Sequence, residues 1–134
     1  MVSRPQRFTA VVLDRSAGFR LFLRVALAKI GVDVVAEATE GDLALDLYEK
    51  HRPDVLLMDV SLDGTDGVRS AERVLAHHPN AIVVMCSARV IRAEVQACQH
   101  AGVAHFLMKP VTSSRVQDIV GSLLRRVRRW NQAA

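Results

Sequence analysis

The chain has 134 residues, half of them hydrophobic, and a formal net charge of +4. This length favours one domain, and the lack of a secretory signal pattern or an apolar run of about 20 residues predicts a cytoplasmic protein with no membrane partner. The basic charge lies at the two ends, whereas residues 31–120 carry thirteen acidic and eight basic residues, which argues against a nucleic-acid-binding protein.

Five apolar segments are predicted to be strands, and each is followed by a segment with helical periodicity. The strand segments are residues 10–13, 33–36, 55–58, 81–85 and 104–108, and the helical segments are residues 19–30, 43–47, 68–75, 90–98 and 116–127. The first, third and fourth strand segments lack polar alternation, which suits strands that are buried on both faces. A strand–helix pair repeated five times predicts a parallel sheet with helices on both sides.

Polar residues follow four of these strand segments. Asp14 follows the first segment, Asp59 the third, Ser87 the fourth and Lys109 the fifth. Because the carboxyl ends of parallel strands meet at one edge of the sheet, we expect these side chains to lie close together. One aspartate after a strand often only caps a helix, but two acids, a hydroxyl and a lysine from four strands predict a shared site.

Four segments carry a family resemblance: VVLDRS (11–16), DVLLMDVSLDGTDG (54–67), VVMCSA (83–88) and GVAHFLMKP (102–110). They resemble the receiver domains of bacterial two-component response regulators. The resemblance implies a single receiver domain over residues 1–134, with its core at about 8–128. It also implies an α/β fold of the flavodoxin-like (βα)5 kind, with a doubly wound five-stranded parallel sheet in the order 2-1-3-4-5.

The resemblance also implies a function and a role for individual residues. Asp59 would be the phosphoacceptor in phosphorelay signalling, and Lys109 would pair with the phosphoryl oxygens. Ser87 would turn toward those oxygens, and Phe106 would follow it as an aromatic switch residue. Phosphorylation would then change the surface that binds partners, so we expect a signalling module and not an enzyme, apart from self-phosphorylation and self-dephosphorylation at Asp59.

The family's metal site is altered at Arg15. Asp14, Asp59 and the backbone carbonyl of Ser61 are the expected Mg²⁺ ligands, but family members usually carry a second acid where this chain has Arg15. A guanidinium offers no oxygen to a metal, so we expect Mg²⁺ binding to be weakened. Replacing a carboxylate by a guanidinium changes the charge of the site by +2, which is the charge of the missing ion.

The sequence is consistent with three consequences of Arg15. Arg15 could act as a built-in cation during phosphoryl transfer. It could instead bridge Asp14 and Asp59 and lock the domain in one state, or point to solvent and leave a damaged metal site. The lock would make the chain an atypical pseudo-receiver, a protein-interaction module that works without phosphorylation.

Two enzyme-like or redox alternatives fit the residues less well. A phosphatase of the haloacid dehalogenase type would need a second aspartate at position 61, where this chain has Ser61. A flavodoxin-like electron carrier would need a loop rich in serine, threonine and glycine after the first strand, where this chain reads DRSAGF.

The partners implied by the resemblance are a sensor histidine kinase or phosphotransfer protein, and a downstream target or output domain. The apolar stripe from Val116 to Val127 is compatible with a homodimer through the last two helices. The Arg-rich end RRVRRW (125–130) is interpreted as a solvated helix face, as the start of a linker to an output domain, or as a weak patch for an acidic partner or nucleic acid.

Overall fold

A computed structural model describes the backbone of residues 7–133 and the side chains of residues 7–127. The strands are β1 (Phe8–Leu13), β2 (Val32–Ala38), β3 (Val55–Met58), β4 (Val83–Ser87) and β5 (His105–Met108). The helices are α1 (Ala17–Ala28), α2 (Ala44–His51), α3 (Gly67–His77), α4 (Arg92–Ala101) and α5 (Ser113–Ala133), with a short 3-10 turn, η1 (Gly41–Leu43), before α2. No helix in this part of the chain is both long and apolar enough to span a bilayer.

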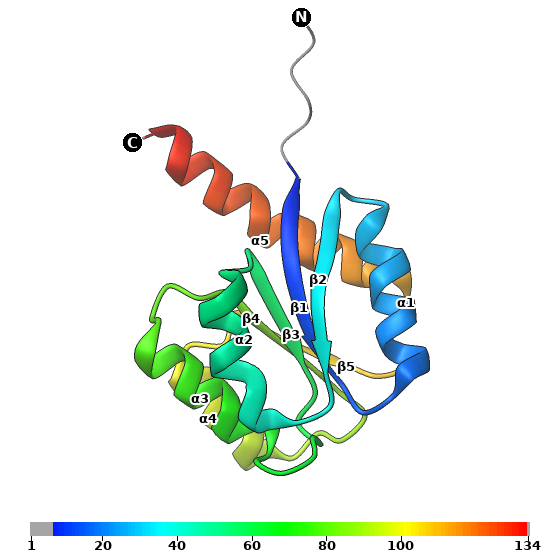
Figure 1. Cartoon of the computed structure of the whole chain (residues 1–134), viewed down its shortest axis with the longest axis vertical. Coiled ribbons are helices and arrows are strands. Elements are labelled where there is room, and N and C mark those ends of the chain that lie inside the picture. Colours follow the sequence, from blue (N-terminus) through cyan, green and yellow to red (C-terminus); the bar gives the residue numbers. More distant parts are fainter. Residues whose placement is uncertain (1–6, 134) are drawn as a thin grey trace, which may run out of the picture.

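The five strands form one parallel sheet in the order β2-β1-β3-β4-β5. Helices cover both faces of this sheet (Figure 1). The predicted fold class, strand order and strand directions are therefore confirmed. Since all five strands run the same way, their carboxyl ends and the loops that follow them lie at one edge of the sheet.

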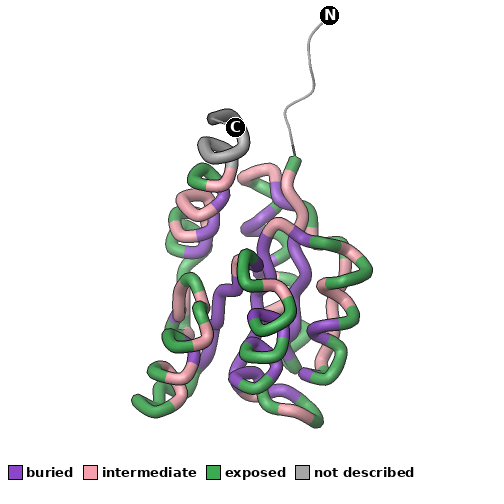
Figure 2. The backbone as a smooth tube through the Cα atoms, turned by 90° about the vertical axis from the view of Figure 1, so that its left-hand side faces the viewer, coloured by how far each residue is buried: buried purple, intermediate pink, exposed green. Residues whose placement is uncertain are grey.

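Each face of the sheet has its own apolar layer, because successive side chains of a strand point to opposite faces. Leu56 packs with residues of α2, α3 and α4, whereas its neighbour Leu57 packs with residues of α1 and α5. Both leucines are fully buried. Figure 2 shows the buried positions gathered along the strands and on the helix faces that turn toward them. The two layers together hold the strand ends in fixed positions.

Several element boundaries differ from the prediction. Strand β4 begins at Val83 instead of residue 81 and runs on to Ser87. The helix predicted from residue 90 begins at Arg92, because Ile91 has an extended backbone, and both Val90 and Ile91 are exposed. Apolar residues that the periodicity assigned to a buried stripe therefore lie in the loop after β4. In α4, Cys98 is the one residue that is fully buried.

Candidate functional site

Three strand ends bring charged side chains together on Lys109. Asp14 follows β1, Asp59 follows β3 and Lys109 follows β5. The Lys109 ammonium nitrogen, Nζ, lies 2.8 Å from Oδ2 of Asp14 and 2.8 Å from Oδ2 of Asp59. Both aspartates are buried, with 2% of Asp14 and 9% of Asp59 exposed. Three of the four residues predicted to lie together are thus in direct contact, and one ammonium links two carboxylates.

The surroundings of Lys109 keep it charged. Burial acts to lower its pKa, but hydrogen bonds and charge attraction from Asp14 and Asp59 outweigh burial, so that the pKa of Lys109 is raised. Its ammonium also lies 4.1 Å from the centre of the Phe19 ring, close enough for a cation–π contact. Lys109 is therefore a fixed positive charge at the carboxyl edge of the sheet.

The loops hold the other oxygen of each carboxylate. Oδ1 of Asp14 accepts a hydrogen bond from the backbone N–H of Ser16 at 2.8 Å, and Oδ1 of Asp59 accepts one from the N–H of Ser61 at 3.1 Å. The Ser16 hydroxyl in turn accepts from the N–H of Phe19 and caps α1. Each carboxylate is thus oriented by its own loop and by Lys109 together.

The loop after β3 passes very close to the start of α3. A Cβ atom at Gly67 would lie only 1.9 Å from the backbone oxygen of Asp59, so only glycine fits there. The N–H of Gly67 donates to the oxygen of Val60 at 2.8 Å, and Asp66 caps α3 by accepting from the N–H of Arg69. The amino end of α3 is therefore fixed directly against the Asp59 backbone.

Ser87 is the last residue of β4, and Phe106 lies on the neighbouring strand β5. Ser87 is buried, its hydroxyl accepts from the N–H of Arg89 at 3.1 Å, and its carbonyl accepts from the N–H of Lys109 at 2.8 Å. Phe106 is half-buried and lines a pocket of about 410 Å³ between α4 and β5. The Lys109–Pro110 bond is cis.

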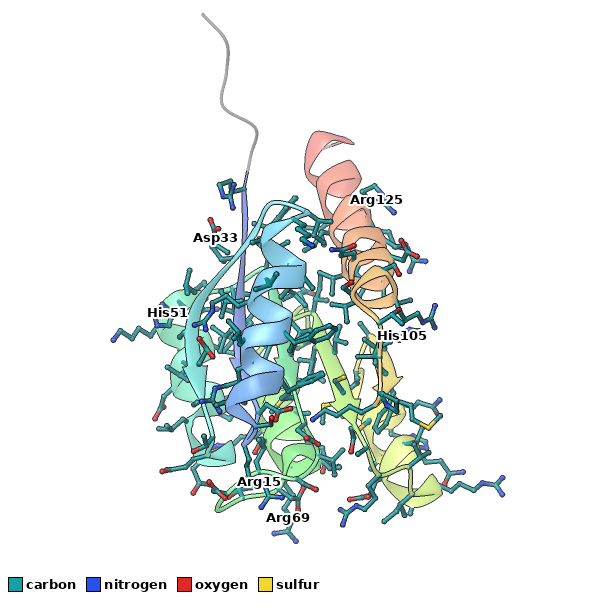
Figure 3. The ribbon with its side chains drawn as sticks, turned by 90° about the vertical axis from the view of Figure 1, so that its right-hand side faces the viewer. Arg15, Asp33, His51, Arg69, His105 and Arg125 are labelled. Atoms are coloured by element: carbon teal, nitrogen blue, oxygen red, sulfur yellow. The ribbon has the colours of Figure 1, made fainter. Side chains whose placement is uncertain are left out.

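Of the three alternatives for Arg15, the structure contradicts the bridge between Asp14 and Asp59 and matches the one in which Arg15 is exposed to solvent. Arg15 is exposed and has no hydrogen bond or ion pair to any side chain between residues 7 and 127. Lys109 makes the bridge instead, because it reaches both buried carboxylates from the end of β5. Figure 3 shows Arg15 at the same end of the molecule as Arg69 on α3, the end where the strands terminate.

The residues present can supply part of a Mg²⁺ site. Mg²⁺ is commonly held by one or two carboxylates, with waters and phosphate oxygens completing its six ligands. Asp14, Asp59 and the Ser61 carbonyl supply oxygens of this kind, but no cluster of three or more metal-binding side chains occurs within residues 7–127. The donor chemistry fits Mg²⁺, with one carboxylate fewer than the family pattern.

Two contacts of the site were not predicted. Phe19, which the periodicity assigned only to a helix stripe, also faces Lys109. Arg20 donates from Nη1 to the backbone oxygen of Asp14 at 2.6 Å and pairs with Glu37 on β2. The position of both residues in the first turns of a helix that starts at the site edge was the one available indication.

Comparison with known proteins identifies the family. The model of the response regulator receiver domain matches residues 10–121. The chemotaxis protein CheY of Bacillus subtilis is 31% identical over 85% of this chain and 95% of its own length, and CheY of Thermotoga maritima is 30% identical over 84% and 94%. The signal receiver domain of the response regulator NarL from Mycobacterium tuberculosis is 34% identical, covers 92% of this chain and 98% of its own, and superposes with a TM-score of 0.80. The chain therefore belongs to the response regulator receiver domain family of two-component systems.

Proposed function

We propose that this receiver domain accepts a phosphoryl group on Asp59. The observation that carries the proposal is the convergence of Asp14 and Asp59 on the Lys109 ammonium, at 2.8 Å from each carboxylate. Asp59 is the carboxylate in the central position, since β3 lies between β1 and β4 in the sheet. Its side chain is 12% exposed and lies at the carboxyl edge of the sheet, from which a donor would have to approach.

In the proposed reaction, an oxygen of the Asp59 carboxylate attacks the phosphorus of a donor. With a phosphohistidine donor, a P–O bond to Asp59 forms as the P–N bond breaks, and the electron pair stays on the imidazole nitrogen, which takes up a proton. Charge gathers on the phosphoryl oxygens in this step, and a fixed cation beside them stabilises it. Lys109 is the residue placed to do so.

Mg²⁺, when bound, would be held by Asp14, Asp59 and the Ser61 carbonyl, and would neutralise charge on the phosphoryl oxygens. Hydrolysis of the resulting acyl phosphate would return the domain to its resting form. Apart from this self-phosphorylation and self-dephosphorylation, the domain works as a signalling module and not as an enzyme.

Ser87 and Phe106 offer a route from the site to the surface. The Ser87 hydroxyl contacts its own loop at the N–H of Arg89, so turning it toward a phosphoryl oxygen would release that hydrogen bond. The Phe106 side chain on β5 lines the pocket beside α4, where a change in its position would alter the exposed surface. We infer that this surface contacts a downstream target or output domain. A sensor histidine kinase or phosphotransfer protein as donor, a cytoplasmic location and a homodimer through α4 and α5 remain predictions.

The test is to incubate the full chain with acetyl phosphate and to map the modified residue by mass spectrometry and Phos-tag gels. The variant Asp59→Asn removes the proposed acceptor, and Asp63→Asn is a matched control, since Asp63 is an exposed aspartate of the same loop. Wild type and Asp63→Asn should be labelled to the same extent, and Asp59→Asn should not be labelled. Equal labelling of Asp59→Asn would refute the proposal.

A further inference from the structure

Arg15 is a positive charge beside the site with no partner assigned to it. It follows Asp14 directly in the loop between β1 and α1, and the N–H of Ser16 ties that loop to the Asp14 carboxylate. The two arginines of α1 are used differently, because Arg20 and Arg24 both pair with Glu37 on β2. Arg15 is exposed and makes no hydrogen bond or ion pair with the described side chains.

Each carboxylate oxygen of the unphosphorylated site already receives one donor. Asp59 receives Lys109 on one oxygen and the Ser61 N–H on the other, and Asp14 receives Lys109 and the Ser16 N–H in the same way. Lys109 and the two N–H groups therefore orient both carboxylates in the resting state without Arg15, although each oxygen can still accept a second hydrogen bond.

Phosphorylation changes this balance of charge. Two carboxylates and one ammonium give the resting site a charge of −1. A phosphoryl group carries about −1.5 to −2 and three strong acceptor oxygens, so phosphorylated Asp59 has more negative charge and more acceptors than Lys109 alone can satisfy. The planar guanidinium suits such oxygens, because its N–H groups can donate to two of them at once.

We propose that Arg15 folds over the phosphoryl group on Asp59 and, together with Lys109, supplies the positive charge that the group needs, so that its binding depends little on Mg²⁺. This inference rests on the proposed function of Asp59. It assigns to Arg15 a phosphoryl-binding role, in which the guanidinium neutralises charge that Mg²⁺ would otherwise neutralise. The metal is then an optional ligand of the site and not a required one.

The experiment measures the linkage between Mg²⁺ and a phosphoryl mimic. Trifluoroberyllate, BeF3⁻, coordinates a carboxylate oxygen in place of the phosphoryl group, and its binding can be followed by ¹⁹F NMR and calorimetry. Its affinity is measured with Mg²⁺ and with EDTA for wild type, Arg15→Asp and Arg69→Asp. The last variant is the matched control, since it makes the same charge change at the same end of the molecule (Figure 3).

In wild type and Arg69→Asp, Mg²⁺ should change the BeF3⁻ affinity by less than about threefold, whereas in Arg15→Asp it should raise the affinity by more than about tenfold. Because linkage is reciprocal, BeF3⁻ should raise the Mg²⁺ affinity of Arg15→Asp by the same factor. A second variant, Arg15→Gln, removes the cation without adding a metal ligand. It should bind BeF3⁻ at least about fivefold more weakly than wild type in EDTA.

The outcomes separate this inference from the proposed function. A wild type that binds BeF3⁻ with a Mg²⁺ effect above about tenfold would overturn the role of Arg15 but leave Asp59 as the acceptor. Equal behaviour of Arg15→Asp and Arg69→Asp would also overturn it, since general electrostatics would then explain the effect. A wild type that binds no BeF3⁻ with or without Mg²⁺ would overturn the proposed function itself.

Discussion

Lys109 is the residue that balances the charge of the two buried carboxylates at the carboxyl edge of the sheet. Replacing it with glutamine leaves two buried carboxylates facing each other without a cation. We expect Lys109→Gln to lower the free energy of unfolding by about 1–3 kcal/mol, because a buried charge that loses its partner keeps its desolvation cost. Urea denaturation followed by circular dichroism measures this. Lys29→Gln, at an exposed lysine, should change the stability by less than about 0.5 kcal/mol.

The same variant gives the prediction a pH dependence. The pKa of Lys109 is raised in the folded state, so its contribution is complete below the unfolded-state value, 10.5, and is lost as the pH rises through the higher folded-state pKa. The stability difference between wild type and Lys109→Gln should therefore stay constant from about pH 7 to 9 and shrink above about pH 10.5. A difference that persists unchanged to about pH 11.5 would contradict this assignment.

At this scale the sequence predicts which residues meet, but not how they pair. Asp14, Asp59 and Lys109 could be found because parallel strands end at one edge, whatever the side chains do. The choice between Arg15 and Lys109 as the bridge depends on which side chain reaches both carboxylates from its own loop. Such a choice is set by the backbone direction after β1 and β5, which no local pattern in the sequence encodes.

At the scale of the elements, the contact between α3 and the end of β3 depends on Gly67. An alanine Cβ would lie 1.9 Å from the Asp59 oxygen, so the helix start or the Asp59 loop has to move. We expect Gly67→Ala to cost about 2–4 kcal/mol in the free energy of unfolding and to reduce labelling of Asp59. Urea denaturation and Phos-tag gels give the two readouts.

Gly18→Ala is the matched control for this change. Gly18 also lies in the first turn of a helix beside the site, but an added Cβ would meet nothing closer than the Ser16 hydroxyl at 3.8 Å. Alanine is the better helix former there, so this variant should be as stable as wild type or more stable by about 0.5–1 kcal/mol. Equal stabilities of Gly67→Ala and Gly18→Ala would show that the close approach of the Asp59 backbone does not require glycine at position 67.

The elements themselves were largely predictable, and their limits were not. The run from Val55 to Met58 was found with its bounds because it is apolar at every position and is followed by Asp59. The helical periodicity wrongly placed Val90 and Ile91, in the segment after β4, within a helix that has a buried stripe, since both are apolar yet exposed. The local sequence alone does not distinguish apolar residues at the surface from those in the core. The tertiary position of the β4–α4 loop decides their exposure.

At the scale of the whole molecule, the two apolar layers share one sheet, and we infer that they unfold as one cooperative domain. Leu56 and Leu57 are adjacent and fully buried, but they face opposite layers, so they report on the two layers separately. Leu56→Ala and Leu57→Ala should each cost about 2–5 kcal/mol. If the layers are coupled through the sheet, hydrogen exchange of α3 peptides and of α1 peptides should accelerate together in both variants.

The exposed Val35 on the edge strand β2 provides the control, since Val35→Ala should cost less than about 1 kcal/mol and leave exchange of both helices nearly unchanged. Exchange that accelerates only in α3 for Leu56→Ala, and only in α1 for Leu57→Ala, would show two units that open independently. A coupled result has a consequence for signalling. The carboxyl ends of the strands, where Asp59 lies, could then not become more mobile on one face of the sheet alone. A conformational change at the site would therefore have to reach the surface through loops such as the one after β4.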